Sequence, residues 1–157
     1  MEISLGVRRE HHAIAFWHAA QNESIRRMLP LSASSPEEAA AQWRAAQAPG
    51  ASSYGRIILA DGRYIGDVWC YCIDTAGQPQ AMLSYCIIDP SMHGRGVATQ
   101  AVQLFLEEIA ERFSIRTVGA FTFADNMPSI RVLEKCDFVR QELFEEDGRL
   151  SCYYQRN

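Results

Sequence analysis

The sequence predicts an α/β fold, with an α+β mixed sheet flanked by helices. Apolar, β-branched runs alternate with segments of helical period in the order β-α-α-β-β-β-α-β-α-β-β. Two turn signals, Asp61-Gly62 and Asp147-Gly148, each separate two strand-like runs and predict tight hairpins. A third feature, between residues 82 and 112, is a buried strand followed by a glycine turn and a long amphipathic run.

Length and composition restrict the class of protein. The 157 residues fit one domain, residues 1–157, with a substantial core. The net charge of −4 argues against a general nucleic-acid binder, which would need a basic face. No apolar run approaches the roughly 20 residues of a membrane span, and residues 1–9 lack the apolar region of a signal peptide. We therefore expect a cytoplasmic protein that binds neither nucleic acid nor membranes.

Cysteine and histidine positions do not predict a metal site. The odd cysteine count and the absence of a Cys-x-x-Cys pair indicate neither a disulfide framework nor a zinc site. Adjacent His11 and His12 would point in different directions on a helix, so we expect them to be surface residues or residues whose hydrogen bonds are satisfied within the protein. The five cysteines, expected to be reduced, are Cys70, Cys72, Cys86, Cys136 and Cys152.

The N-terminal third predicts one strand and two helical regions. Residues 2–7 form the strand, and residues 8–28 have a helical pattern with Asn22 as the candidate break. Ser35 is the expected N-cap of the next helix, which begins with a proline at its first position and runs to about residue 48. The remaining elements are strands at 54–60, 63–73, 115–123, 138–145 and 150–155 and a helix at 126–136.

The segment from residue 82 to 112 carries the candidate chemistry. Its strand should stop at Pro90, which cannot donate a ladder hydrogen bond. The turn Gly94-Arg95-Gly96 then leads into a helix, whose free N–H groups and dipole attract anions. The glycines permit close backbone approach and the arginine adds charge, so we predict a pyrophosphate-binding cradle. From the pattern alone, an ordinary strand-to-helix turn is the alternative. The expected apolar helix face is Val97, Ala98, Ala101, Val102, Phe105, Leu106 and Ile109.

Two motifs in this order resemble those of a known superfamily. The segment His93-Gly94-Arg95-Gly96-Val97-Ala98 resembles the acyl-CoA signature Gln/Arg-x-x-Gly-x-Gly/Ala of the GNAT acetyltransferases. Residues 126–138 resemble that superfamily's Asn-x-x-Ser-x-x-x-Leu-x-Lys-x-Gly-Phe segment, and look most like the subgroup of ribosomal-protein alanine N-acetyltransferases. The resemblance implies a GNAT-like acyl-CoA N-acyltransferase fold that uses acetyl-CoA as its acyl donor and no metal.

The resemblance also implies roles for individual residues. Asn126 would bind the pantetheine arm, which we favour over its alternative role as a helix N-cap. Ser129 would bind CoA and protonate the leaving thiolate, with simple packing in the helix as the alternative. The other expected CoA-binding residues are Cys86, Ile87 and Ile88 at the strand end and His93, Gly94, Arg95, Gly96, Val97, Ala98 and Thr99 in the cradle.

The sequence departs from the superfamily pattern at four positions, which are His93, Met82, Gln100 and Asp137. Met82 replaces an acidic residue and thereby leaves the general base open. Glu145, Asp67, Tyr85 or a water chain could take that role, and we name Ser129, Tyr85 and Glu145 as the catalytic candidates. Asp137 replaces a glycine, so the end of that helix should be strained or reshaped.

The expected function is transfer of an acetyl group to a primary amine, either a small molecule or a protein N-terminus. A non-catalytic acyl-CoA sensor of the same fold is the alternative, and a dinucleotide-binding fold is disfavoured because the third glycine is missing. The sequence leaves open whether the protein forms a homodimer. The resemblance places Trp17, Met28, Leu29 and Trp43 near the acceptor, but we favour helix-packing core positions for them.

Overall fold

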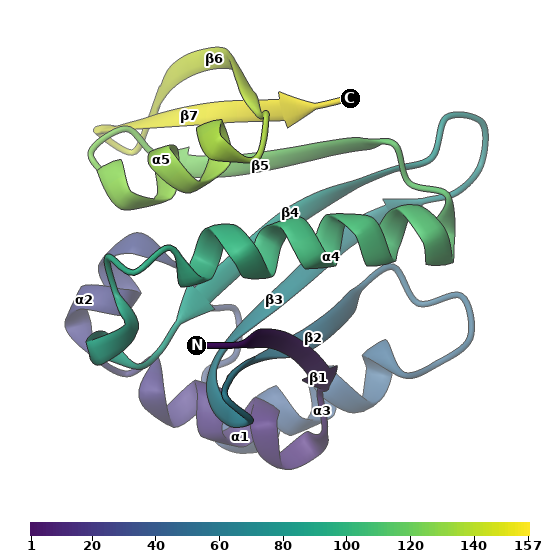
Figure 1. Cartoon of the computed structure of the whole chain (residues 1–157), viewed down its shortest axis with the longest axis vertical. Coiled ribbons are helices and arrows are strands. Elements are labelled where there is room, and N and C mark those ends of the chain that lie inside the picture. Colours follow the sequence, from purple (N-terminus) through teal and green to yellow (C-terminus); the bar gives the residue numbers. More distant parts are fainter.

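A computed structural model describes all residues, 1–157, and contains one seven-stranded sheet with helices on both faces (Figure 1). The strand order is β1-β2-β3-β4-β5-β7-β6, and every neighbouring pair is antiparallel except β4 and β5. The sheet is therefore mixed, as the sequence predicts. Its strands are β1 (Ile3–Val7), β2 (Tyr54–Ala60), β3 (Arg63–Asp74), β4 (Gln80–Ile87), β5 (Thr117–Phe123), β6 (Val139–Glu146) and β7 (Arg149–Arg156).

The helices divide between the two faces of the sheet. Helix α4 packs against β1, β3 and β4 on one face, beside α5, whereas α1 and α3 pack together on the other (Figure 1). None of the helices is both long and apolar enough to cross a membrane. Their bounds are α1 (Glu10–Ala19), α2 (Glu23–Met28), α3 (Pro36–Ala46), α4 (Val97–Phe113) and α5 (Met127–Lys135), with a short 3₁₀ turn at Pro90–Met92.

Local signals in the N-terminal third are confirmed. Asn22 does break the first helical region, because its side chain accepts a hydrogen bond from the Ser24 N–H at 2.8 Å and starts α2. The protein thus has one more helix than the predicted order. The Ser35 hydroxyl accepts from the Glu38 N–H at 3.0 Å and caps α3, as expected.

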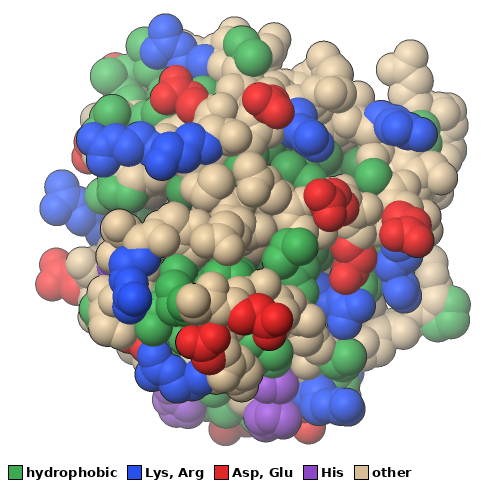
Figure 2. All heavy atoms as spheres, viewed as in Figure 1, with side chains coloured by type: hydrophobic (Ala, Val, Ile, Leu, Met, Phe, Trp, Pro, Cys, Tyr) green, Lys and Arg blue, Asp and Glu red, His purple; other side chains and the backbone are tan.

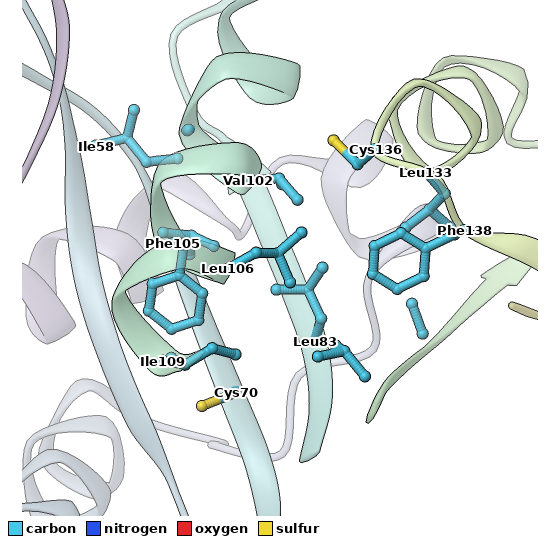
Figure 3. Close-up of a cluster of buried hydrophobic side chains, with 14 of the residues drawn as sticks. Ile58, Cys70, Leu83, Val102, Phe105, Leu106, Ile109, Leu133, Cys136 and Phe138 are labelled. Carbon is cyan, nitrogen blue, oxygen red and sulfur yellow. The ribbon is translucent and has the colours of Figure 1, made fainter. Parts of the chain in front are cut away.

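The core lies between α4 and the sheet and extends to α5 (Figure 3). Helix α4 buries six of the seven residues predicted for its apolar face, while Ala98 is partly exposed. Phe105, for example, is 0% exposed, and burying such a side chain stabilises the fold by about 1.5–3 kcal/mol. Leu133, Cys136 and Phe138 extend the same core to the end of α5.

The end of α5 keeps the usual glycine geometry without a glycine. Asp137 has a φ of +68°, in the left-handed region that favours glycine. Its N–H bonds to the Glu134 carbonyl at 3.1 Å, and the Phe138 N–H bonds to the Leu133 carbonyl at 3.0 Å. This double hydrogen bond is the Schellman motif. The expected strain is therefore present, but the helix end is not reshaped.

Acidic and basic side chains are interspersed on the face of the molecule that carries α4 (Figure 2). All five cysteines are free thiols.

Candidate active site

The two parallel strands in the middle of the sheet diverge. Hydrogen-bonded pairing of β4 with β5 covers only three register pairs, of which Met82↔Gly119 is the last. Beyond it, residues 83–87 still pair with β3, and residues 120–123 still pair with β7, but they do not pair with each other. The facing backbone groups of the two strands are thus left without a strand partner, and the open end of the divergence lies beside the start of α4 (Figure 1).

Six consecutive backbone N–H groups, from Gly94 to Thr99, make no hydrogen bond within the protein. We call this segment the cradle. Gly94 and Gly96 have φ values of +73° and +74°, and a Cβ added at either position would meet no atom within 4 Å. The turn is therefore glycine-dependent for its backbone conformation, and the space in front of it is open. Free donors at the positive end of a 17-residue helix form an anion site.

Side chains tie the cradle to the end of β4. The His93 Nε2–H donates to the Ile87 carbonyl oxygen at 2.9 Å, which fixes the tautomer of the ring. Asp89 accepts from the Ser91 N–H at 3.0 Å and pairs with Arg63 at 2.8 Å. Arg95, by contrast, is exposed, forms no ion pair and hydrogen-bonds only to the Met92 sulfur, at 3.8 Å, so its charge is free for an anionic ligand.

Two of the catalytic candidates are in contact. The Tyr85 hydroxyl on β4 lies 2.8 Å from the Ser129 Oγ in the first turn of α5, and it can also donate to the Ser129 carbonyl oxygen at 3.2 Å. Burial raises the pKa of the Tyr85 phenol far above its ordinary range, although the hydrogen bond with Ser129 acts in the opposite direction. The phenol therefore stays protonated at neutral pH and is a proton donor rather than a base.

The structure gives Asn126 a local role. Its side-chain oxygen accepts from the Ser129 N–H at 3.4 Å and caps α5. The N-cap alternative is thus present, and a pantetheine contact remains a prediction. Cys86 is partly buried on β4, and burial, followed by the charge of Asp67, raises the pKa of its thiol to about 12. That thiol is not an activated nucleophile.

A cavity of about 1100 Å³ lies mainly on the face of the sheet that carries α1 and α3, and it is bounded by these helices, the segment after α2 and strands β2 to β7. Its lining also includes Arg112 of α4. It reaches β4 through Leu83 and Ser84 and reaches β5 through residues 121–123, so it adjoins the divergence. All four residues that we favoured as core, Trp17, Met28, Leu29 and Trp43, line this cavity, and none belongs to the core. That expectation was wrong, because helical periodicity does not distinguish a face on the core from a face on a cavity.

The indole N–H groups on this wall are satisfied by backbone. Trp17 donates to the Ala33 carbonyl at 3.1 Å and Trp43 donates to the Arg8 carbonyl at 2.9 Å. Their rings are therefore held in place by hydrogen bonds.

The candidate bases lie away from the cavity surface. Asp67 is 0% exposed, so it cannot contact an acceptor directly, and its two oxygens accept hydrogen bonds from Arg8 Nε at 2.6 Å and from the Tyr64 hydroxyl. Burial raises the pKa of Asp67, and Arg8 and Tyr64 act in the opposite direction. Glu145 is exposed on β6 and does not line the cavity, whereas its neighbour Glu146 does. Strand alternation could have indicated this difference, since successive side chains point to opposite faces.

Several cavity residues were not identified from the sequence. They are Arg8, Arg56, Trp69, Tyr71, Arg112, Phe121, Phe123, Phe144 and Glu146. Those on β5 and β6 share one face of the sheet. Phe121 pairs with Tyr153 and Phe144 pairs with Ser151, and these two partners lie two positions apart on β7, so they point the same way. Period-two alternation was a usable signal there, but it does not show which face is covered by core.

Comparison with known proteins gives one family. The profile described as acetyltransferase (GNAT) domain matches residues 6–139. The protein of Bacillus subtilis (strain 168) named probable N-acetyltransferase YjcK is 26% identical over 98 residues, which are 62% of this chain and 54% of that protein. The match thus spans about half the length of that curated relative.

Solved structures share the fold across nearly the whole chain. The aminoglycoside acetyltransferase AAC(6')-Ib in complex with coenzyme A has a TM-score of 0.82 and 16% identity, covering 99% of this chain and 95% of that one. RimL, a ribosomal L7/L12 α-N-protein acetyltransferase in complex with coenzyme A, has a TM-score of 0.82 and 20% identity, with coverages of 98% and 93%. Spermidine N-acetyltransferase from Vibrio cholerae, in complex with CoA and spermine, has a TM-score of 0.82 and 16% identity, with coverages of 98% and 92%.

Proposed function

Because the chain belongs to the GNAT acetyltransferase family, we propose that it transfers the acetyl group of acetyl-CoA to a primary amine. The observation that carries this proposal is the row of six free N–H groups in the cradle, placed at the open end of the divergence between β4 and β5. The cradle fits a pyrophosphate, and the divergence fits an extended, amide-bearing arm. An acceptor cavity adjoins the same divergence from the other face.

The protein would hold CoA largely through backbone groups. The N–H groups of residues 94–99 would donate to the pyrophosphate oxygens, with Arg95 adding a solvated charge. The free edge of β4 around Cys86 and Ile87 would pair with the pantetheine amides as an added strand. Asn126 would contribute from the start of α5.

Tyr85 and Ser129 would supply the proton that the leaving thiolate needs. Their hydroxyl groups are 2.8 Å apart, and the raised pKa of the phenol keeps that proton in place until it is taken. A proton passed from Ser129 to the sulfur would be replaced from Tyr85, and water would return to Tyr85 a proton equivalent to the one that the attacking amine releases. The pair would act in the transition state, so its loss should appear mainly in kcat.

The acceptor amine would lose its proton without a carboxylate at position 82. Met82 carries no titratable group, and Asp67 is sealed behind Arg8 and Tyr64. Water in the acceptor cavity would carry the proton away. The same Met82 departure is the observation that favours the second candidate function, a protein that holds acyl-CoA without turnover.

Release of the CoA thiol from acetyl-CoA, measured with and without a panel of primary amines, tests the proposal. We expect amine-dependent thiol release and a mass increase of one acetyl group on the amine. CoA should also raise the melting temperature, whereas NAD should not, because only CoA has the pantetheine arm that fits beside β4. Stabilisation by acetyl-CoA with no acetylated amine would favour the non-catalytic alternative, and equal stabilisation by CoA and NAD would contradict the CoA site.

A further inference from the structure

We propose that the acceptor is a monoamine with an aromatic body and a carboxylate, and that Arg8 binds this carboxylate in the cavity. The inference rests on the proposed acetyl transfer and specifies its second substrate. It predicts that polycationic amines, such as polyamines and aminoglycosides, are poor acceptors.

The first argument is the apolar character of the cavity wall. Aromatic side chains from helices α1 and α3 and from four strands of the sheet converge on it, and they include all three tryptophans of the protein. Such a wall favours a flat, apolar ligand body over a hydrated polyol or an extended polyamine. The aromatic lining residues are Phe16, Trp17, Trp43, Tyr54, Trp69, Tyr71, Phe121, Phe123 and Phe144.

The second argument is the charge of the wall. Three lining residues are arginines, but Arg56 pairs with Glu108 of α4 at 2.8 Å and Arg112 belongs to α4 itself, so these two charges lie toward the opposite face of the sheet. On the wall formed with α1 and α3, the charged side chains are Arg8 and the carboxylate of Glu146. A polycation would therefore find a single anionic partner on this wall, whereas a carboxylate would find Arg8.

The third argument is the geometry of Arg8. Its Nε is held by the buried Asp67 at 2.6 Å, and Asp67 is held in turn by the Tyr64 hydroxyl. The two terminal nitrogens of the guanidinium have no protein partner, and the side chain lines the cavity. A guanidinium fixed at one edge and free at the other is suited to bidentate binding of a carboxylate.

Arg8 also connects the aromatic wall to strand β4. Its backbone carbonyl accepts the Trp43 indole N–H at 2.9 Å. On the other side, its partner Asp67 is paired across strands with Cys86 of β4, and such partners have Cα atoms about 5 Å apart. In an α-amino acid the amine and the carboxylate share one carbon atom. A carboxylate on Arg8 would therefore hold the amine beside β4, with the aromatic side chain against the tryptophans.

Steady-state kinetics with four acceptors tests the inference: L-phenylalanine, phenethylamine, spermidine and kanamycin. We expect the highest kcat/KM for phenylalanine. Arg8→Met should raise the KM for phenylalanine about 10- to 100-fold, as expected for loss of a charge-assisted pair, and should leave the KM for phenethylamine within about twofold. The matched control is Arg44→Met, because Arg44 is 58% exposed and pairs with Glu10 away from the cavity.

Arg8→Met leaves Asp67 buried without its cationic partner and could unfold the protein. The double variant Arg8→Met/Asp67→Asn removes both charges and should show the same selective loss for phenylalanine. A higher kcat/KM for spermidine or kanamycin would overturn the inference and leave acetyl transfer intact. An equal effect of Arg8→Met on phenylalanine and phenethylamine would remove the carboxylate contact. Absence of thiol release with all four amines would contradict acetyl transfer itself.

Discussion

Replacing Gly96 by alanine separates backbone strain from ligand binding. Gly96 has a φ of +74°, and no protein atom lies within 4 Å of an added Cβ. The variant therefore creates no internal collision, but a non-glycine residue in the left-handed region costs about 1–2 kcal/mol. For a chain of this length each kcal/mol lowers the melting temperature by about 2–4 °C. Gly96→Ala should thus melt a few degrees below the wild type in the absence of CoA.

The added methyl group also points into the open space of the cradle. If CoA approaches the backbone there, the methyl group displaces it from one or two N–H donors. Hydrogen bonds to a charged group contribute about 1.5–3 kcal/mol each, so we expect CoA affinity to fall about 10- to 100-fold. Isothermal titration calorimetry with CoA measures this loss directly.

Gly77→Ala is the matched control. Gly77 has a φ of +68° and also has nothing within 4 Å of an added Cβ, but it lies in the loop before β4, about 25 Å from the cradle. It should show the same thermal destabilisation with unchanged CoA affinity. Wild-type CoA affinity in Gly96→Ala, or equal affinity losses in both variants, would refute main-chain anchoring.

Three further changes have defined outcomes. Ser129→Ala and Tyr85→Phe should each lower kcat about 10²-fold or more in steady-state kinetics with little change in the Kd for acetyl-CoA, since acid catalysis acts in the transition state; an unchanged kcat would remove that residue from the mechanism. Asp137→Gly should raise the stability by about 0.5–1 kcal/mol in urea unfolding, because glycine relieves the strain at a φ of +68°; a loss of stability would mean that the aspartate side chain is needed. Burial acts to raise the pKa of Glu108, but hydrogen bonds from Arg56 and Tyr54 dominate and hold it below its ordinary value. Glu108 therefore stabilises the fold above its unfolded pKa, and this stabilisation is lost as pH falls through the lower folded pKa. Glu108→Gln should thus be less stable than wild type at pH 7 and equal to it once the pH is below the lowered pKa of Glu108, and a pH-independent difference would contradict the assignment.

Local chemistry made most elements of the fold predictable from the sequence. Asn22 and Ser35 cap their helices with their own side chains, and the two Asp-Gly turns act within four residues. The cradle was predictable for the same reason, since Gly94 and Gly96 specify a backbone that other residues adopt only with strain.

Long-range contacts could not be predicted in the same way. The Arg8–Asp67 pair joins residues 59 apart, and the Tyr85–Ser129 contact joins residues 44 apart. The sequence named Tyr85 and Ser129 separately but not their contact, because that contact depends on how far β4 and β5 diverge. Trp17 was expected in the core for a related reason: its helical position is apolar whether the neighbour is core or cavity.

Hydrogen exchange of the six cradle N–H groups tests the central claim most directly. In the free protein these groups have no hydrogen-bond partner, so the amides of residues 94–99 should exchange rapidly. Saturating CoA should slow exchange throughout this segment, while the amides of the loop around Gly77 should be unaffected. Unchanged exchange in residues 94–99 at a CoA concentration that saturates binding would contradict the cradle as the CoA site.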